Sequence, residues 1–216
     1  MRPHEIETAR LRLRPLAKAD VDELHPLWSS HEVRRYLWDN EVIDRQWTAS
    51  LVAESLSLFA AHGYGLWGAR LHDREELVGF GGFWYFHTPP KLDLLYGIAP
   101  EHWNRGLATE IAQALVCYGF EELEFSEVWA SMDASNVAST SVLKQAGLRF
   151  ERRAVVDGLE THFYSLPRSA FQPVGAAPHA GRGPADVTVP GYNGGLEWIL
   201  QLVICSDRAP GFRRTS

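Results

Sequence analysis

Two periods of hydrophobic and polar residues run along residues 1–170 and predict a domain of strands and helices. Leu11 and Leu13 alternate with arginines, which is the period of a half-buried strand. Apolar residues at helical spacing predict helices at about 20–28, 44–62, 106–118 and 138–146. Short apolar runs predict further strands at 66–71, 77–85, 92–98, 128–132, 148–156 and 159–167. This order of elements predicts an α+β domain with one central sheet.

Glycines indicate where several of these elements turn. Asp157-Gly158 favours a two-residue hairpin turn between the last two strands. Gly63 is a suitable end for the second helix. The glycines between Gly79 and Gly82 interrupt a strand pattern, which indicates a bulge or a place where another backbone or a ligand comes close.

The composition of the chain changes near Phe171. From Gln172 to about Gly195 the chain is rich in Gly, Pro and Ala and has no sustained period. Such a stretch buries too little surface to offset its ordering entropy. A short apolar segment, Leu196–Cys205, follows it. We therefore expect a folded domain at 1–170 and an extension at 171–216 that is mobile or weakly docked.

Charge and composition narrow the class of protein. The 216 residues hold 21 Lys plus Arg against 27 Asp plus Glu, a net charge of −6, which disfavours nucleic acid as the main partner. The apolar run Trp198–Cys205 is far shorter than a membrane span, and Met1–Glu5 shows no signal peptide. Cys117 and Cys205 are too few for a disulfide framework or a zinc site. We expect a cytoplasmic protein that binds no metal, membrane or nucleic acid.

The stretch Pro100–Glu110, PEHWNRGLATE, lies between a predicted strand and a predicted helix. Free backbone N–H groups at a helix start, together with the helix dipole, form an anion site. Gly106 lets the backbone approach a phosphate without a Cβ in the way, Ala108 is also small, and Arg105 adds positive charge. The alternative is an ordinary turn, and neither a Walker A sequence nor a dinucleotide fingerprint is present.

A second stretch, Ser131–Leu148, reads SMDASNVASTSVLKQAGL. A strand ends here, Asn136 and Ser139 follow, and a short helix runs to Gly147. Taken alone, this pattern is that of a helix cap and surface hydroxyl groups.

The two stretches together, in this order, resemble the GCN5-related N-acetyltransferase (GNAT) superfamily, and within it the RimJ/RimL-like branch of ribosomal-protein alanine acetyltransferases. The resemblance covers about 5–168 and is carried by IETARLRLRPL, YGIAPEHWNRGLATE and NVASTSVLKQAGL. It implies a mixed, mostly antiparallel sheet that is flanked by helices and splayed at an acyl-CoA site. It also implies acetyl-CoA as co-substrate and a primary amine as acceptor.

The resemblance also assigns residues to acetyl-CoA. The middle motif matches the pyrophosphate loop, with Trp103 where many members have Gln or Arg. The backbone near Ile98 would hold the pantetheine and the thioester oxygen, and Asn136 would bind the pantetheine or cap its helix. The residues implied for acetyl-CoA binding are Ile98, Trp103, Asn104, Arg105, Gly106, Leu107, Ala108, Thr109 and Asn136.

Acyl transfer to an amine needs a base, because an ammonium has no lone pair. Asp93 on the central strand is the first candidate, directly or through water, and His87 is the alternative. Many superfamily members protonate the leaving thiolate with a Tyr on the last helix, where this chain has Leu143. The branch implies Ser139 as the substitute, acting as an acid or orienting a water.

The acceptor pocket is predicted opposite the acetyl-CoA entry. Its candidate aromatic wall is Trp28, Tyr36, Trp38, Trp84, Tyr85 and Phe86, and its candidate acidic groups are Asp39, Glu41 and Asp44. For most of these residues the alternatives are core packing and helix-start charges.

The favoured function is direct transfer to a protein N-terminal α-amine in a ternary complex, with Cys117 facing the core rather than carrying an acyl group. One alternative is an acetyltransferase of a small amine, such as a polyamine, an amino acid or an aminoglycoside-like drug. Another is a non-catalytic acyl-CoA-binding regulatory module. An edge strand or the Leu196–Cys205 segment offers a homodimer contact.

Overall fold

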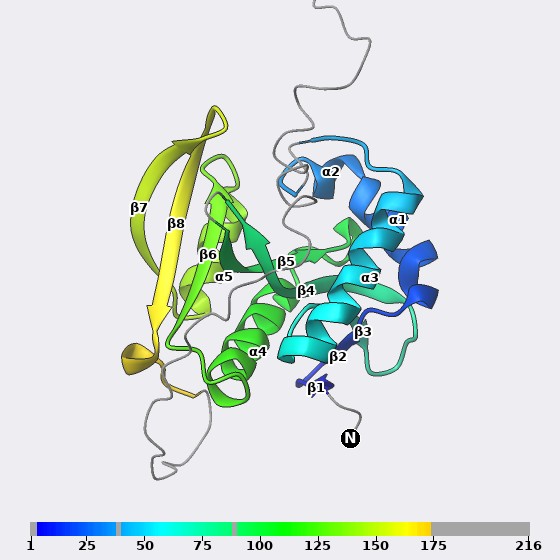
Figure 1. Ribbon diagram of the computed structural model, residues 1–216, viewed down its shortest axis with the longest axis horizontal. Coiled ribbons are helices and arrows are strands. Elements are labelled where there is room, and N and C mark those ends of the chain that lie inside the picture. The colour runs from blue at the N-terminus through cyan, green and yellow to red at the C-terminus, as the bar shows by residue number, and fades with distance from the viewer. Residues whose placement is uncertain (1–3, 38–39, 88–89, 174–216) are drawn as a thin grey trace, which may run out of the picture. The chain divides into compact units, whose positions relative to one another are not determined.

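The computed structural model describes residues 4–37, 40–87 and 90–173. Trp38, Asp39 and the extension from residue 174 onward, including Leu196–Cys205, lie outside the described residues. The strands are β1 (Ile6–Glu7), β2 (Leu11–Pro15), β3 (Leu66–Leu71), β4 (Leu77–Phe86), β5 (Lys91–Ile98), β6 (Glu127–Asp133), β7 (Arg149–Val156) and β8 (Leu159–Pro167) (Figure 1). The α-helices are α1 (Val21–Ser29), α2 (His31–Arg34), α3 (Arg45–His62), α4 (Leu107–Glu121) and α5 (Val137–Gln145). Short 3₁₀ turns cover Lys18–Asp20, Pro100–His102 and Arg168–Ala170.

Within the described residues, eight strands form one sheet in the order β1-β2-β3-β4-β5-β6-β8-β7. Neighbouring strands are antiparallel except β5 and β6, which are parallel and pair at Asp93 and Trp129. That pair lies near the start of both strands, so β5 and β6 part toward their carboxyl ends. The predicted mixed and mostly antiparallel sheet is confirmed, and its splay lies between these two strands.

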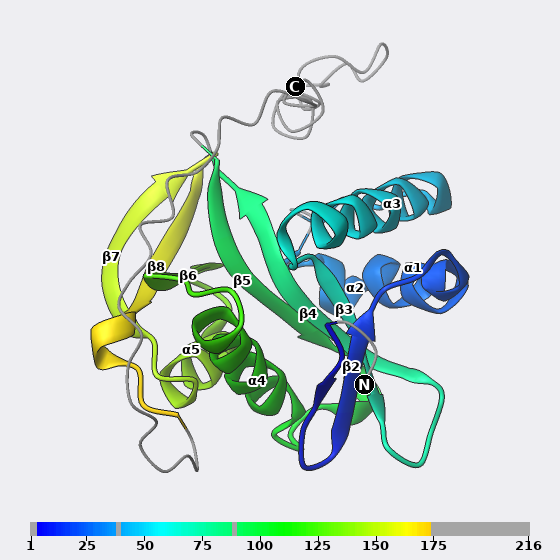
Figure 2. The same cartoon turned by 60° about the horizontal axis from the view of Figure 1, so that its bottom comes forward.

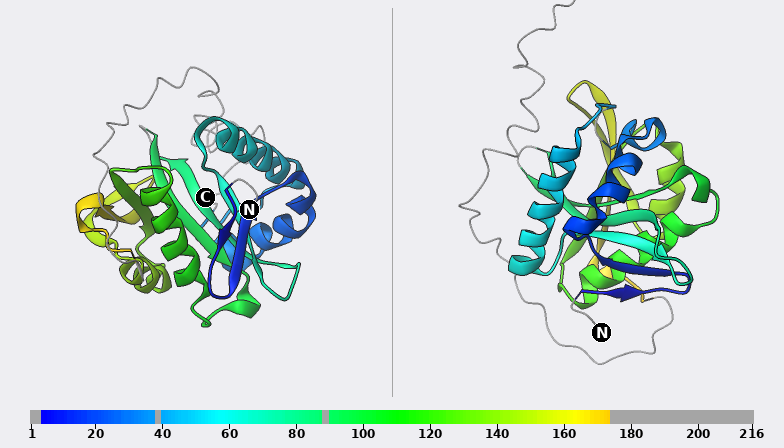
Figure 3. Two further views of the ribbon diagram at one scale, coloured as in Figure 1. Left: turned by 90° about the horizontal axis from the view of Figure 1, so that it is seen from below. Right: turned by 90° about the vertical axis from the view of Figure 1, so that its right-hand side faces the viewer.

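Helices cover both faces of the sheet (Figures 2 and 3). Phe80 of β4 contacts Trp28 of α1, with ring centroids 5.7 Å apart. The next residue on that strand, Gly81, faces Ile111 and Leu115 of α4. Because adjacent strand residues point to opposite faces, α1 and α4 lie on opposite sides of the sheet. We call these sides the α1–α3 face and the α4–α5 face.

The helix ends follow from local sequence. The Asp44 carboxylate accepts the backbone N–H of Trp47 and caps the start of α3. Gly63 ends the same helix in the left-handed conformation, with φ 78°, and its N–H donates to the carbonyl of Phe59. The Asp157-Gly158 turn joins β7 and β8 as predicted. β1 and α2 are too short to show a period, and the sequence pattern did not predict them.

The glycines of β4 allow close backbone approach, as one of the two interpretations predicted. A Cβ on Gly82 would lie 2.1 Å from the carbonyl oxygen of Gly65, and one on Gly79 would lie 2.6 Å from that of Gly97. The register between β3 and β4 also shifts, between Ala69 and Arg70, so a bulge is present as well.

A buried ion pair joins the first helical segment to the sheet. Asp20 and Arg70 are 3% and 1% exposed, and an Asp20 carboxylate oxygen lies 2.7 Å from a guanidinium nitrogen of Arg70. Asp20 also accepts the backbone N–H of Ala17 and an N–H of Arg14. The carboxylate is therefore held by several donors, as a buried charge requires.

Candidate active site

The predicted phosphate loop joins β5 to α4. Asn104 and Gly106 both adopt positive φ, 59° and 73°, and Gly106 is the N-cap of α4. A Cβ on Gly106 would meet only a side-chain nitrogen of Arg10, at 3.5 Å. The space in front of this glycine is therefore open, as a site for a bound anion requires.

Two side chains brace the start of α4 from the first hairpin. Arg10 donates from its backbone N–H and its side chain to the Glu110 carboxylate and donates a further guanidinium N–H to the carbonyl of Arg105. Thr8 donates its hydroxyl to the same carboxylate, with the two oxygens 2.6 Å apart. Burial works against ionisation of Glu110, but these hydrogen bonds outweigh it and lower its pKa. The carboxylate stays charged and the loop backbone is fixed.

The loop presents backbone donors that suit a pyrophosphate. The first intrahelical bond of α4 runs from the N–H of Glu110 to the carbonyl of Gly106. Among the described residues, no acceptor takes the backbone N–H groups of 105–109. The side chain of Leu107 is buried in the core, so only its N–H serves the loop, whereas Arg105 is exposed. These groups fit the pyrophosphate of an acyl-CoA.

The end of β5 provides the next polar groups. The N–H of Ala99 donates to the carbonyl of Val78 on β4, so the alternating N–H of Ile98 points toward β6 and the splay. The indole of Trp103 donates to the carbonyl of Ile98 at 2.8 Å. This bond ties the phosphate loop to the strand end. Trp103 itself is 47% exposed.

On the α4–α5 face, Tyr96 of β5 meets Ser139 of α5. Their hydroxyl oxygens are 2.9 Å apart. Burial raises the pKa of Tyr96, and the bond to Ser139 offsets only part of that effect. Tyr96 therefore stays neutral, and its hydroxyl can donate to the Ser139 carbonyl, 3.4 Å away, or share its proton with the Ser139 hydroxyl.

Asn136 is seen in one of its two predicted roles. Its side-chain oxygen accepts the backbone N–H of Ser139 at 3.3 Å and caps α5. Leu143 is 1% exposed and belongs to the core, so no acid stands at that position. Cys117 is half-buried on α4.

On the opposite, α1–α3 face, Asp93 forms a hydrogen-bonded chain with two other side chains. Asp93 is three positions before Tyr96 on β5 and therefore points to the other face. It is 2% exposed, and its carboxylate accepts the Ser131 hydroxyl at 2.6 Å. Ser131 in turn lies 2.8 Å from Nε2 of His87, which also lies 3.4 Å from the same carboxylate. The structure thus brings both predicted base candidates together.

Cationic and aromatic side chains flank this chain of hydrogen bonds. The Lys91 ammonium sits over the ring of Trp129, and the Arg152 guanidinium over the ring of Phe163. Burial lowers the pKa of Lys91, while Asp93 and other carboxylates nearby act in the opposite direction. The His87 ring also packs on Phe163, with centroids 5.3 Å apart.

The candidate aromatic wall divides between core and surface. Trp28 and Trp84 are buried, as the core alternative predicted. Tyr85 is half-buried and shares a 2.7 Å hydrogen bond with Tyr64, and Phe86 is also half-buried. Tyr36 is 38% exposed. Of the acidic candidates, Asp44 is a helix cap and Glu41 is exposed.

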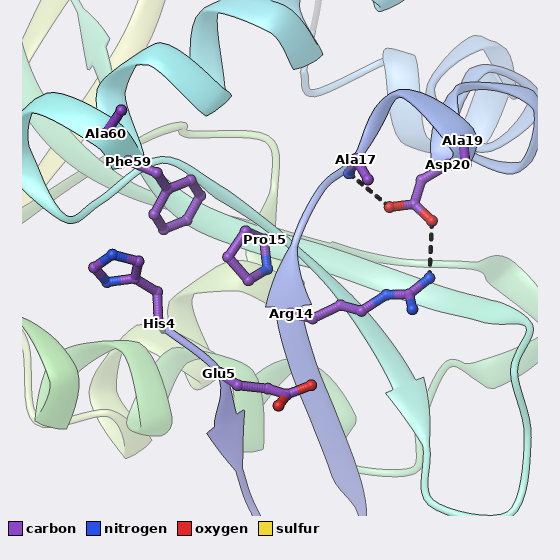
Figure 4. Close-up of a pocket in the computed structure, with 9 residues that line it drawn as sticks. All are labelled: His4, Glu5, Arg14, Pro15, Ala17, Ala19, Asp20, Phe59 and Ala60. Atoms are coloured by element: carbon purple, nitrogen blue, oxygen red, sulfur yellow. Dashed lines mark hydrogen bonds and ion pairs between the residues drawn. The ribbon is translucent and has the colours of Figure 1, made fainter. Parts of the chain in front are cut away.

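A concavity of about 570 Å³ lies elsewhere, beside β2 and α3 (Figure 4). It is lined by His4, Glu5, Arg14, Pro15, Ala17, Ala19, Asp20, Phe59 and Ala60. None of these residues belongs to the predicted site. Its buried carboxylate, Asp20, already has protein donors, as the dashed lines in Figure 4 indicate.

The described residues lack two features that would indicate particular partners. No group of three or more His, Cys, Asp or Glu side chains there is placed to hold a metal ion. No helix in the same residues is long and apolar enough to cross a bilayer.

The match to known proteins covers the residues that build this site. The family model described as an acetyltransferase (GNAT) domain matches residues 10–149. This chain belongs to the GNAT acetyltransferase family. Enzymes of this family use acetyl-CoA, and the free donors at the start of α4 fit that co-substrate. The GNAT resemblance predicted from sequence is confirmed.

Three individual GNAT relatives share between 18% and 30% of their residues with this chain. An uncharacterized N-acetyltransferase of Bacillus subtilis, YoaA, is 30% identical over 147 residues, which cover 68% of this chain and 83% of the relative. The spermidine N(1)-acetyltransferase of Escherichia coli K12 is 24% identical over 154 residues, 65% of this chain and 74% of the relative. Among solved structures, RimL, a ribosomal-protein α-N-acetyltransferase in complex with coenzyme A, matches with a TM-score of 0.66 at 18% identity, covering 77% of this chain and 99% of that one.

The sequence did not predict the side-chain contacts of three residues at the site. Tyr96 was seen only as part of a backbone motif, and Ser131 only as the end of a strand. Arg10 was seen as one arginine of an alternating strand. The strand period places Ser131 and Trp129 on one face. That Asp93 pairs with Trp129 across the parallel strands is known only from the fold.

Proposed function

We propose that this chain transfers acetyl from acetyl-CoA directly to a protein N-terminal α-amine in a ternary complex. The observation that carries the proposal is the two-sided splay between β5 and β6. Anion donors and a hydroxyl pair lie on its α4–α5 face, and a carboxylate–serine–histidine chain lies on its α1–α3 face. Co-substrate and acceptor would thus approach the parted strands from opposite faces of the sheet.

Acetyl-CoA would be held at the α4–α5 face and would supply the activated acetyl group. The backbone N–H groups of 105–109 would bind its pyrophosphate, with the exposed guanidinium of Arg105 adding charge. The Ile98 N–H, which points into the splay, is placed to stabilise negative charge on the thioester oxygen. Asn136 would reach the pantetheine only with its amide N–H groups, because its oxygen caps α5.

Ser139 and Tyr96 would act at the sulfur. A thiol has a pKa near 8.5 in its ordinary environment, so the leaving thiolate needs only a modest proton donor. With Tyr96 as the donor in the bond between the two hydroxyls, the Ser139 hydroxyl would donate to the sulfur or to a water beside it. Leu143 supplies no acid in this chain.

An α-amine suits the α1–α3 face because it needs less help to deprotonate. An α-amine has a pKa near 8 and a lysine-like amine one near 10.4. RimL, which shares the fold, is named for α-N-acetylation of a ribosomal protein. A small-amine acceptor is the second candidate, and the spermidine-acetylating relative favours it.

The test is amine-dependent release of CoA thiol from acetyl-CoA by the full chain. A lysine-free peptide with a free N-terminal alanine, its N-terminally blocked copy, and spermidine are compared as acceptors. We expect turnover with the free peptide and none with the blocked one. Faster turnover with spermidine would replace the α-amine by the small-amine acceptor. Binding of acetyl-CoA with no release for any amine would indicate the regulatory module.

A further inference from the structure

We propose that His87 is the group that takes the proton from the acceptor amine, and that Ser131 and Asp93 are positioning residues that hold its ring. This inference rests on the proposed function and names the base within it. It reverses the order in which the sequence ranked Asp93 and His87.

The hydrogen bonds run in one direction. An ionised carboxylate only accepts, so the Ser131 hydroxyl donates its proton to Asp93. Having donated its only proton, the Ser131 oxygen can only accept from Nε2 of His87, which lies 2.8 Å away. Nε2 therefore carries the ring proton, and Nδ1 keeps a lone pair. A neutral imidazole with a bare nitrogen is a base ready for use.

Asp93 itself is poorly placed to take the proton. It is 2% exposed, and its bonded oxygen already accepts from Ser131. The His87 side chain is 21% exposed and lies at the more exposed end of the hydrogen-bonded series Asp93, Ser131 and His87. Of the two base candidates, the imidazole is the one more exposed to solvent.

The backbone of His87 supports a functional role. Its φ is 71°, in the left-handed region that non-glycine residues rarely adopt. Strained conformations of this kind are kept where the surrounding structure fixes them and cluster at functional sites. Here the fixing contacts are the hydrogen bond to Ser131 and the tilted packing of the ring on Phe163.

The charged groups that face His87 are few in the described residues. Asp93 comes from β5, and Lys91 lies two positions earlier on the same strand, over Trp129. Arg152 of β7 covers Phe163, the ring on which His87 packs.

The proton balance of the transfer is then complete. The N–C bond forms as the C–S bond breaks, and the bonding electrons of C–S leave with the sulfur. An ammonium acceptor loses two protons: Nδ1 of His87 takes one and releases it to water, and the other ends on the CoA sulfur. No oxidant, reductant or metal is needed.

Kinetics of variants test the assignment with the alanine peptide as acceptor. We expect His87→Gln to lower kcat at pH 7 by about 100-fold, the scale of a positioned base, with KM for acetyl-CoA unchanged. His72→Gln, the same change at an exposed histidine bonded to Thr8, is the matched control and should keep wild-type rates. His87→Gly suits the positive φ, and added imidazole should restore part of its rate. A wild-type rate for His87→Gln, or full loss in His72→Gln, would overturn the assignment.

The positioning role makes separate predictions. Ser131→Ala should lower kcat by about tenfold, and Ser131→Thr, which keeps the hydroxyl, should recover it. Raising the pH from 7 to 9 supplies more unprotonated α-amine, so the His87→Gln deficit should shrink. A deficit that is independent of pH, or a Ser131→Thr variant no better than Ser131→Ala, would contradict a relay through this hydroxyl.

Nitrogen-15 NMR of the imidazole rings tests the relay without any acceptor. The His87 signals, assigned by their loss in His87→Gln, should show the Nε2–H tautomer in wild type and a mixture of tautomers in Ser131→Ala. A wild-type Nδ1–H tautomer overturns the relay. If wild type gives no amine-dependent CoA release, the proposed function fails and the NMR result alone decides the relay.

Discussion

The hydroxyl oxygens of Tyr96 and Ser139 lie 2.9 Å apart and join the central strand to the last helix across the α4–α5 face. Three positions before Tyr96, Asp93 anchors the second hydrogen-bonded group on the other face. A single strand, β5, thus carries one of these contacts on each face of the sheet. Both lie beside the parallel pairing of β5 with β6, which is at Asp93 and Trp129.

Removal of the Ser139 hydroxyl should affect turnover more than binding. We expect Ser139→Ala to lower kcat by about 100-fold, the low end for a positioned proton donor, with little change in the KM for acetyl-CoA. Steady-state CoA release measures both constants. Tyr96→Phe should produce a smaller loss because Ser139 remains. The double variant should lose little more than Ser139→Ala alone, since the two hydroxyls act as a unit. Fully additive losses would contradict that coupling.

A bulky side chain at Gly106 should abolish acetyl-CoA binding. Gly106→Trp covers the open space in front of the loop and its free N–H groups. Positive φ makes any side chain costly there, by about 1–2 kcal/mol. Gly158→Trp is the matched control, because Gly158 has φ 83° and no atom within 4 Å of its Cβ position. Calorimetry should show binding by the control only. Equal affinity in both variants would remove the phosphate-loop assignment.

The Glu110 carboxylate should make stability depend on pH in the acidic range. Its folded-state pKa is lowered by donors from Thr8 and Arg10, despite burial. Its stabilisation is therefore complete above the unfolded pKa, near 4.3, and is lost as the pH falls through the lower folded value. Glu110→Gln should lose about 1.5–3 kcal/mol at pH 7, as expected for hydrogen bonds to a charged group.

Thermal unfolding from pH 7 to pH 3 checks this prediction. The difference in Tm between wild type and Glu110→Gln should narrow as the pH falls. A constant difference would mean that the amide replaces the carboxylate fully.

The buried pair of Asp20 and Arg70 should dominate the stability of its region. Asp20→Ala leaves the guanidinium buried without its carboxylate and should cost about 3–5 kcal/mol. Asp22→Ala removes a pair with Arg45 in which both side chains are more than half exposed, and should cost about 0–1 kcal/mol. Urea unfolding of the two variants compares them. Similar losses would indicate that burial does not set the cost.

The sequence predicted those parts of the fold that depend on neighbouring residues. Asp44 and Gly63 end α3 through local capping, and Asp157-Gly158 turns the last hairpin, so propensity alone places them. The glycine turn between β5 and α4 was predicted for the same reason, because strand, glycine and helix follow one another. β1 and α2 were missed because a period needs more residues than either has.

The side-chain contacts of the site depend on the fold as a whole. Tyr96 and Ser139 are 43 residues apart in sequence, and Ser131 and Asp93 are 38 apart. No local pattern marks such partners, because the parallel register of β5 and β6 brings them together. Asp93 and His87 were both named from chemistry, but their order as bases follows only from the burial of one and the exposure of the other.

Calorimetric titration of the full chain with acetyl-CoA, with ATP and NADH as controls, tests the central claim most directly. We expect saturable one-to-one binding of acetyl-CoA, no comparable binding of ATP or NADH, and loss of the acetyl-CoA signal in Gly106→Trp. A folded protein that binds ATP as tightly as acetyl-CoA, or binds neither, would contradict acetyl-CoA binding at this loop.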